Sequence, residues 1–145
     1  SQARQLDLFT MAYVFNPDEA RMMAKAGTDV LVAHMGVTSG GLTGTADVMS
    51  LDDAVNLTNE IIAAGDSVRN DLIHLSHGGP ISGEPEVRYV MSRTKAVGFV
   101  AASSVERTPV ENAIIGAVEN FKNIRVKKFV DEVRNDGQAG TETAN

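Results

Sequence analysis

Residues 72–80 read Leu-Ile-His-Leu-Ser-His-Gly-Gly-Pro, and this stretch decides the fold. A short apolar run ends in a histidine and two glycines, and a helix-like segment follows. The same order recurs where residues 30–33 lead into a polar cluster at 34–41, and where residues 97–102 lead into a serine pair at 103–104. Repeated strand–loop–helix units are typical of parallel α/β proteins, in which ligand groups gather at the carboxyl ends of the strands. We therefore expect the three clusters to form one site.

Length and composition are those of one ordinary globular domain. The chain has 145 residues, 43% hydrophobic and 22% charged, and is much shorter than the roughly 250 residues of a closed eight-stranded α/β barrel. Its net charge of -6 disfavours nucleic acid as a partner, because phosphate binding requires a surplus of lysine and arginine. No apolar run predicts a membrane span or a signal peptide. Since cysteine is absent, a cytoplasmic location is the default expectation.

Helix caps and apolar periodicity divide the chain into four strand–helix units. The first helix is expected to be capped by Asn16, to begin at Pro17 and to end at Gly27. Strands are expected at residues 8–15, 29–33, 72–76 and 96–102, and the later helices at 50–65, 85–95 and 108–122. This alternation predicts an α/β fold with a mainly parallel sheet, whose strands all end on one side. A further helix at 125–134 and a frayed tail to residue 145 are expected.

The paired glycines after the third strand are the strongest local signal. Gly78 and Gly79 can adopt backbone conformations closed to other residues, so their amides can point at a phosphate or carboxylate oxygen. A tight strand-to-loop turn is an equally good interpretation of these glycines alone. Ser103 and Ser104 can likewise bind an anion, or can simply cap the next helix. Their shared position after neighbouring strands favours an anion site.

Two histidines occupy the last position of a strand. His34 and His77 each share a strand face with apolar residues two and four positions earlier, so both can enter a pocket at the carboxyl end of the sheet. An imidazole there can transfer a proton near pH 7 or bind a divalent metal. A structural hydrogen bond is the more common role and remains the alternative for each. His74 lies on the other face, where packing is expected.

Further polar side chains extend the candidate site. Glu106 is a candidate base or metal ligand and Arg107 a candidate anion clamp, with an exposed ion pair at a helix start as the plainer interpretation. The loop at residues 35–49 is too long for a simple connector, so we expect a lid that contacts substrate through Thr38 and Thr43. The loop lacks the Gly-Lys-Ser/Thr ending of a Walker motif, which argues against ATP hydrolysis of that type.

Four ordered motifs carry a family resemblance. They are residues 9–16 (Phe-Thr-Met-Ala-Tyr-Val-Phe-Asn), 32–36 (Val-Ala-His-Met-Gly), 77–81 (His-Gly-Gly-Pro-Ile) and 102–111 (Ala-Ser-Ser-Val-Glu-Arg-Thr-Pro-Val-Glu). With these motifs the chain resembles the phosphoenolpyruvate hydrolase-like, or TIM-barrel signal-transduction, family. That family is similar in turn to the carboxyl-terminal part of a plant tobamovirus-resistance protein. The resemblance implies that residues 1–124 form a half-barrel of four βα units, like the second half of a (β/α)8 TIM barrel.

The resemblance also implies an activity. The expected enzyme binds a small phosphorylated or carboxylated metabolite and cleaves a C–P or P–O bond of a three-carbon acid, with Mg²⁺ held by carboxylates, although these loops contain no clustered acidic motif. Four residues would hold the anion (Gly78, Gly79, Ser103 and Ser104), and three would handle protons or metal (His34, His77 and Glu106). The alternative is a non-catalytic signalling or interaction module that binds an effector or a partner protein.

Four parallel strands would leave two unpaired sheet edges and an open apolar interior, both of which are unfavourable in water. We therefore expect either a missing half-barrel supplied by another chain or self-association of two half-barrels.

Overall fold

A computed structural model describes residues 2–40, 42 and 49–124. Residues 1–111 form one compact unit and residues 112–145 a second. In the first unit, four parallel strands pair in the order β1-β2-β3-β4. They are β1 (Met11–Val14), β2 (Val30–His34), β3 (Ile73–His77) and β4 (Gly98–Phe99). The predicted α/β class with four parallel strands is confirmed. The predicted helix at 125–134, the frayed tail and Thr43 lie outside the described residues, and a domain boundary at residue 124 stays a prediction.

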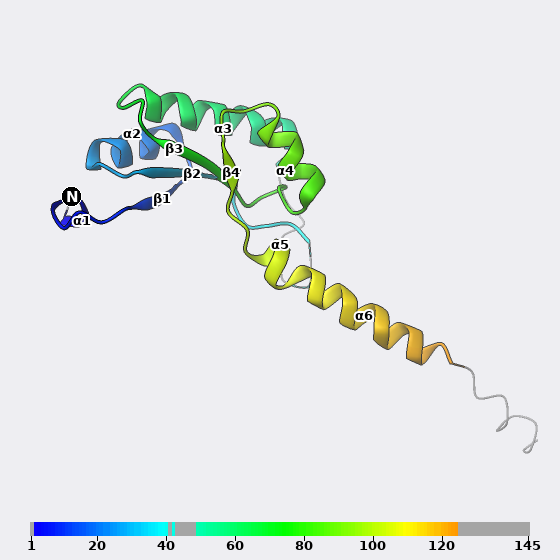
Figure 1. Cartoon of the computed structure of the whole chain (residues 1–145). Coiled ribbons are helices and arrows are strands. Elements are labelled where there is room, and N and C mark those ends of the chain that lie inside the picture. The colour runs from blue at the N-terminus through cyan, green and yellow to red at the C-terminus, as the bar shows by residue number, and fades with distance from the viewer. Residues whose placement is uncertain (1, 41, 43–48, 125–145) are drawn as a thin grey trace, which may run out of the picture. The chain divides into compact units, whose positions relative to one another are not determined.

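Helices connect the strands and cover one face of the sheet. The described helices are α1 (Gln2–Gln5), α2 (Pro17–Ala26), α3 (Leu51–Asp66), α4 (Glu84–Met91), α5 (Ser103–Glu106) and α6 (Thr108–Lys122). Helices α2, α3 and α4 lie on the same side of the strands (Figure 1). In the part of the chain that is described, no helix is both long and apolar enough to span a membrane.

The bounds of α2 follow from its caps, as the sequence predicted. The Asn16 side chain accepts a hydrogen bond from the Glu19 amide at 2.9 Å, and the Glu19 carboxylate accepts one from the Phe15 amide at 2.8 Å. This reciprocal pair satisfies amides that a helix start leaves without partners. Gly27 ends the helix with a φ of 91°, a left-handed conformation that favours glycine. The Ser50 side chain caps the start of α3 as Asn16 caps α2, by accepting a hydrogen bond from the Asp53 amide at 3.1 Å.

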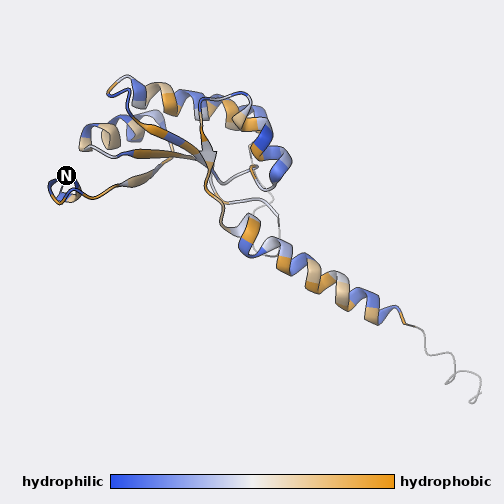
Figure 2. Cartoon of the chain, in the orientation of Figure 1, coloured by the Kyte–Doolittle hydropathy of each residue, from blue (hydrophilic) through white to orange (hydrophobic). Residues whose placement is uncertain are grey.

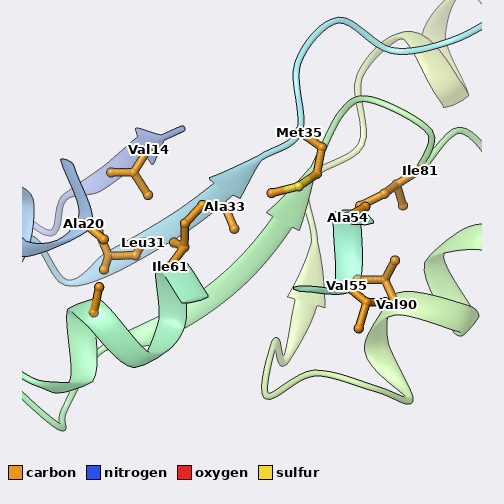
Figure 3. Packing of buried hydrophobic residues seen from close by; sticks show 11 residues of the cluster. Val14, Ala20, Leu31, Ala33, Met35, Ala54, Val55, Ile61, Ile81 and Val90 are labelled. Atoms are coloured by element: carbon orange, nitrogen blue, oxygen red, sulfur yellow. The ribbon is translucent and has the colours of Figure 1, made fainter. Parts of the chain in front are cut away.

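The core lies between the sheet and these helices. Val14, Leu31 and Ala33 point from the strands toward Ala20 on α2 and Ile61 on α3 (Figure 3). Leu31 is 1% exposed and Ile61 is fully buried, so removing either side chain would leave a cavity.

The opposite face of the sheet is apolar and partly exposed. Met11, Tyr13 and Ile73 are 55%, 46% and 41% exposed, while Val32 in the second strand is fully buried. The strands are coloured mainly as hydrophobic, whereas the helices alternate (Figure 2). A sheet with one bare apolar face is the arrangement expected of strands that line a barrel interior.

The last unit departs most from its prediction. Strand β4 has two residues rather than the seven expected at 96–102, and among the described strands it pairs with β3 alone. The predicted helix at 108–122 has the expected bounds, but the short α5 precedes it. No residue of α6 is buried, so its apolar side chains are exposed; they include Val110, Ala113, Ile114, Ala117 and Phe121.

Candidate functional site

Sheet register brings the two predicted histidines together. His34 and His77 pair directly as the last residues of β2 and β3. Their ring centroids are 4.7 Å apart and the ring planes are nearly perpendicular, at 89°. Two imidazoles therefore meet at the carboxyl end of the sheet, where parallel α/β proteins place their ligands.

Aromatic side chains from the first strand complete this cluster. The Tyr13 ring stacks on His77 at 5.2 Å and contacts His34 at 5.0 Å, so the three rings form a compact triangle. Phe15 lies on His34 at 4.6 Å. Sequence reasoning missed both aromatic residues as parts of the site. Their alternate spacing in the first strand places them on one face, and that pattern is the signal that could have identified them.

A backbone amide fixes the proton of His34. The Gly36 amide donates a hydrogen bond to His34 Nδ1 at 3.0 Å, which requires that Nδ1 carry no proton. The neutral ring therefore carries its proton on Nε2. Burial lowers the pKa of His34 below its ordinary value of 6.5, and the neighbouring His77 lowers it further. His34 is consequently neutral at pH 7.

A backbone carbonyl fixes His77 in the opposite way. His77 Nδ1 lies 2.7 Å from the Val100 carbonyl oxygen. A carbonyl can only accept, so Nδ1 must donate and must carry the proton. The lone pair of the neutral ring is then on Nε2. His77 is 8% exposed, so this hydrogen bond holds a largely buried ring in place.

The glycine pair joins two loops. The Gly79 amide donates to the Gly36 carbonyl at 3.0 Å, and the Ser39 amide donates to the Gly79 carbonyl at 3.0 Å. Gly78 and Gly79 have φ values of 75° and 58°, and a Cβ at either position would overlap a backbone carbonyl oxygen of residues 35–36. The amide of Gly79 is thus engaged within the loops, which corrects the expectation that it points at an anion. Anion binding by the Gly78 amide stays a prediction.

The predicted site residues that follow β4 lie in α5 or directly after it. Ser103 and Ser104 are half-buried, and Glu106 is exposed. Within the described residues, no hydrogen bond joins Glu106 to either histidine. The structure therefore brings together His34, His77 and the glycine turn, and roles for the serine pair and Glu106 in the site stay predictions.

Arg107 is held by a carboxylate of its own chain. Its Nη1 donates to both oxygens of Glu111, at 3.0 and 2.9 Å, in a pair that is mostly shielded from solvent. The Leu42 amide donates to the same carboxylate at 3.0 Å. The Leu42 amide and the Arg107 guanidinium hold the pKa of Glu111 below its usual value. Glu111 thus links the long loop after β2 to the segment after β4. Thr38 is half-buried in this loop.

Donors suited to a metal ion are sparse. The described residues contain no cluster of three or more histidine and acidic side chains that could hold a cation. Mg²⁺ can bind through one or two carboxylates together with substrate and water, so the expected Mg²⁺ stays a prediction. His74 packs on the helix side as predicted, 7% exposed, with Nε2 at 2.7 Å from the Asp66 carboxylate.

Comparisons with known proteins agree with the sequence motifs. The family model described as phosphoenolpyruvate hydrolase-like matches residues 1–124. The ToMV susceptible protein tm-1(GCR26) and the ToMV resistance protein Tm-1(GCR237), both from Solanum lycopersicum, are each 45% identical over 126 residues. These matches cover 86% of this chain but only 17% of either relative. A solved structure of nitroalkane oxidase from Streptomyces ansochromogenes is 24% identical and covers 70% of this chain and 29% of its own, at a TM-score of 0.45.

Proposed function

The chain belongs to the phosphoenolpyruvate hydrolase-like family, and from that premise we propose that it binds a small phosphorylated or carboxylated metabolite at the carboxyl ends of β2 and β3. The observation that carries the proposal is the pair of perpendicular imidazoles, His34 and His77, each fixed by one backbone hydrogen bond. In the proposed reaction, water attacks phosphorus, the P–O or C–P bond of a three-carbon acid breaks, phosphate forms, and the released enolate is protonated.

His34 is proposed to bind the anion. Its lowered pKa keeps the ring neutral at pH 7, and its Nε2–H is the nitrogen left for a ligand because the Gly36 amide occupies Nδ1. An N–H donor in a partly buried site binds an anionic oxygen more strongly than the same donor in water. The half-buried Ser103 and Ser104 follow β4, just after the Val100 carbonyl that bonds His77, and are proposed to supply further donors.

His77 is proposed to act as the general base. Its Nε2 can take a proton from a hydroxyl group in the site, that of water or of the ligand, and the Val100 carbonyl that accepts from Nδ1 stabilises the resulting imidazolium. Positioned proton transfer of this kind contributes about 10² to 10⁴ in rate. The proposed steps use the chain's own side chains.

Phosphate release from phosphoenolpyruvate and phosphonopyruvate, measured with and without Mg²⁺, tests this function. We expect His77→Asn to lower turnover by about 10²-fold or more, because it removes the base. The matched control is His74→Asn, which alters the same strand on its other face and should retain turnover if circular dichroism shows a folded chain. Full activity of the His77→Asn variant would contradict the proposed role.

Ligand binding without turnover would contradict the enzymatic part of the proposal. It would support an effector-binding module instead, since the same two imidazoles can bind an anion without reacting with it. Isothermal titration with phosphoenolpyruvate separates the two outcomes, because it measures binding whether or not product forms.

We also propose that a second set of βα units covers the bare face of the sheet, supplied by a second copy when the chain is alone in solution. Strands β1 and β4 each pair with a single described strand, and Met11 and Tyr13 expose apolar surface beside them. Exposed edges and a contiguous apolar face favour association in water.

A further inference from the structure

The two histidines offer a ligand opposite hydrogen-bonding groups. His34 presents an Nε2–H donor because its Nδ1 accepts from the Gly36 amide at 3.0 Å. His77 presents an Nε2 lone pair because its Nδ1 donates to the Val100 carbonyl at 2.7 Å. Backbone groups set both tautomers, so neither ring can exchange its role without breaking a hydrogen bond.

Both Nε2 atoms are available to a ligand. Neither has a hydrogen-bond partner among the described residues, and neither belongs to the buried unpartnered atoms of that part of the chain, which are His74 Nδ1, Ser76 Oγ and Thr108 Oγ1. The rings that carry them are in contact, with centroids 4.7 Å apart. A donor and an acceptor are therefore offered by two rings that are in contact.

We propose that this pair selects a ligand that carries an acceptor oxygen and an O–H donor side by side. Two chemical groups have this pattern: an α-hydroxy acid, and a singly protonated phosphate or phosphonate. The ionised oxygen accepts from His34 Nε2–H, and the hydroxyl donates to His77 Nε2. This inference rests on the proposed function and narrows its ligand class.

A ligand without the hydroxyl is disfavoured for a physical reason. An ether or ester oxygen in its place would leave His77 Nε2 desolvated and unpaired. Leaving such a group without a partner costs about 1 to 3 kcal/mol, which corresponds to roughly 5-fold to 150-fold in affinity. Sites that bond a substrate hydroxyl reject analogues that lack it for the same reason.

The test titrates the full chain, isotope-labelled at its histidine nitrogens, with two pairs of probes. Lactate is compared with O-methyl-lactate at pH 7. Methyl phosphate is compared with dimethyl phosphate also at pH 7, where about a tenth of a phosphate monoester carries one proton. We expect the hydroxyl-bearing member of at least one pair to bind tenfold or more tightly and to shift both Nε2 resonances. A preference in the lactate pair alone identifies the α-hydroxy acid, and one in the phosphate pair alone identifies the phosphoryl group.

Two variants separate the donor role of His34 from the acceptor role of His77. Phenylalanine keeps a ring against Tyr13 but removes the nitrogens, so His77→Phe should abolish the preference for the hydroxyl. His34→Phe should weaken both members of a pair equally. Retention of the preference in His77→Phe would overturn the inference.

The wild-type spectrum gives an independent check that needs no variant. If the nitrogen shifts assign the same tautomer to His34 and His77, the inference is wrong. If O-methyl-lactate and lactate bind equally and both shift the Nε2 resonances, the inference is wrong while the proposed anion site survives. If no probe shifts either resonance, the anion site itself is wrong and the inference fails with it.

Discussion

The contact between the two loops predicts a large cost for Gly79→Ala. A Cβ at this position would lie 2.7 Å from Met35 Cβ and 3.1 Å from the Met35 carbonyl carbon, and it would overlap the Met35 carbonyl oxygen. None of these atoms is the end of a flexible side chain, and Met35 is 4% exposed, so the neighbour cannot move away. The loops must separate to accommodate the methyl group.

Two energies add in this variant. Alanine in the left-handed conformation, here at a φ of 58°, costs about 1 to 2 kcal/mol. Overpacking a closed contact costs about 1 to 3 kcal/mol more. The expected loss in free energy of unfolding is therefore about 2 to 5 kcal/mol, a large share of the roughly 5 to 15 kcal/mol of a typical domain.

Gly40→Ala is the matched control. Gly40 also has a positive φ, 83°, but no described atom lies within 4 Å of its added Cβ, so only the backbone cost of about 1 to 2 kcal/mol applies. Urea unfolding followed by circular dichroism measures both variants, with the slope checked for constancy. Equal midpoints for the two variants would refute the reasoning, because they would mean that the loops are not in close contact at Gly79.

Three further predictions concern charge and exposed surface. Because the folded pKa of His34 is lowered, the unfolded chain binds its proton more tightly, so stability should fall as pH drops below 6.5 toward the lowered pKa. Urea midpoints across this range should show a smaller fall in His34→Gln, and an equal fall would contradict the prediction. Glu111→Gln should speed hydrogen exchange of the Leu42 amide, since a neutral amide oxygen accepts more weakly than a carboxylate; unchanged exchange would show that the contact is unimportant. Met11→Glu should shift a dimer of the chain to monomer in size-exclusion chromatography with light scattering, while Met22→Glu, on the outer surface of α2, should not. A wild-type chain that is monomeric at every concentration would contradict the proposed pairing.

Local sequence signals predicted the regular elements well. Asn16, Gly27 and Ser50 fixed the ends of α2 and the start of α3, because each satisfies helix ends through neighbours in sequence. The alternation of residues placed His34 and His77 on the same face of the sheet, at the ends of their strands. The parallel register then paired them. Signals that act within a few residues were sufficient for this part of the fold.

Contacts between distant segments were not predictable in this way. Tyr13 meets the histidines only because β1 aligns with β2 in a particular register, which alternation alone does not specify. Glu111 bonds the Leu42 amide 69 residues away, and no local pattern identifies that partner.

The glycine turn shows why its two interpretations were hard to separate. Anion binding and tight packing both demand glycine at positive φ, since both bring backbone close to another group. The deciding observation is the hydrogen-bond acceptor of the Gly79 amide, which is the Gly36 carbonyl.

Gly36 is the residue that connects the turn to the imidazoles. Its carbonyl accepts from Gly79, and its amide donates to His34 Nδ1. Packing of the two loops therefore holds the amide that keeps the His34 proton on Nε2. The glycine pair serves the site by fixing a tautomer through one intervening residue, Gly36, whose carbonyl accepts from the Gly79 amide.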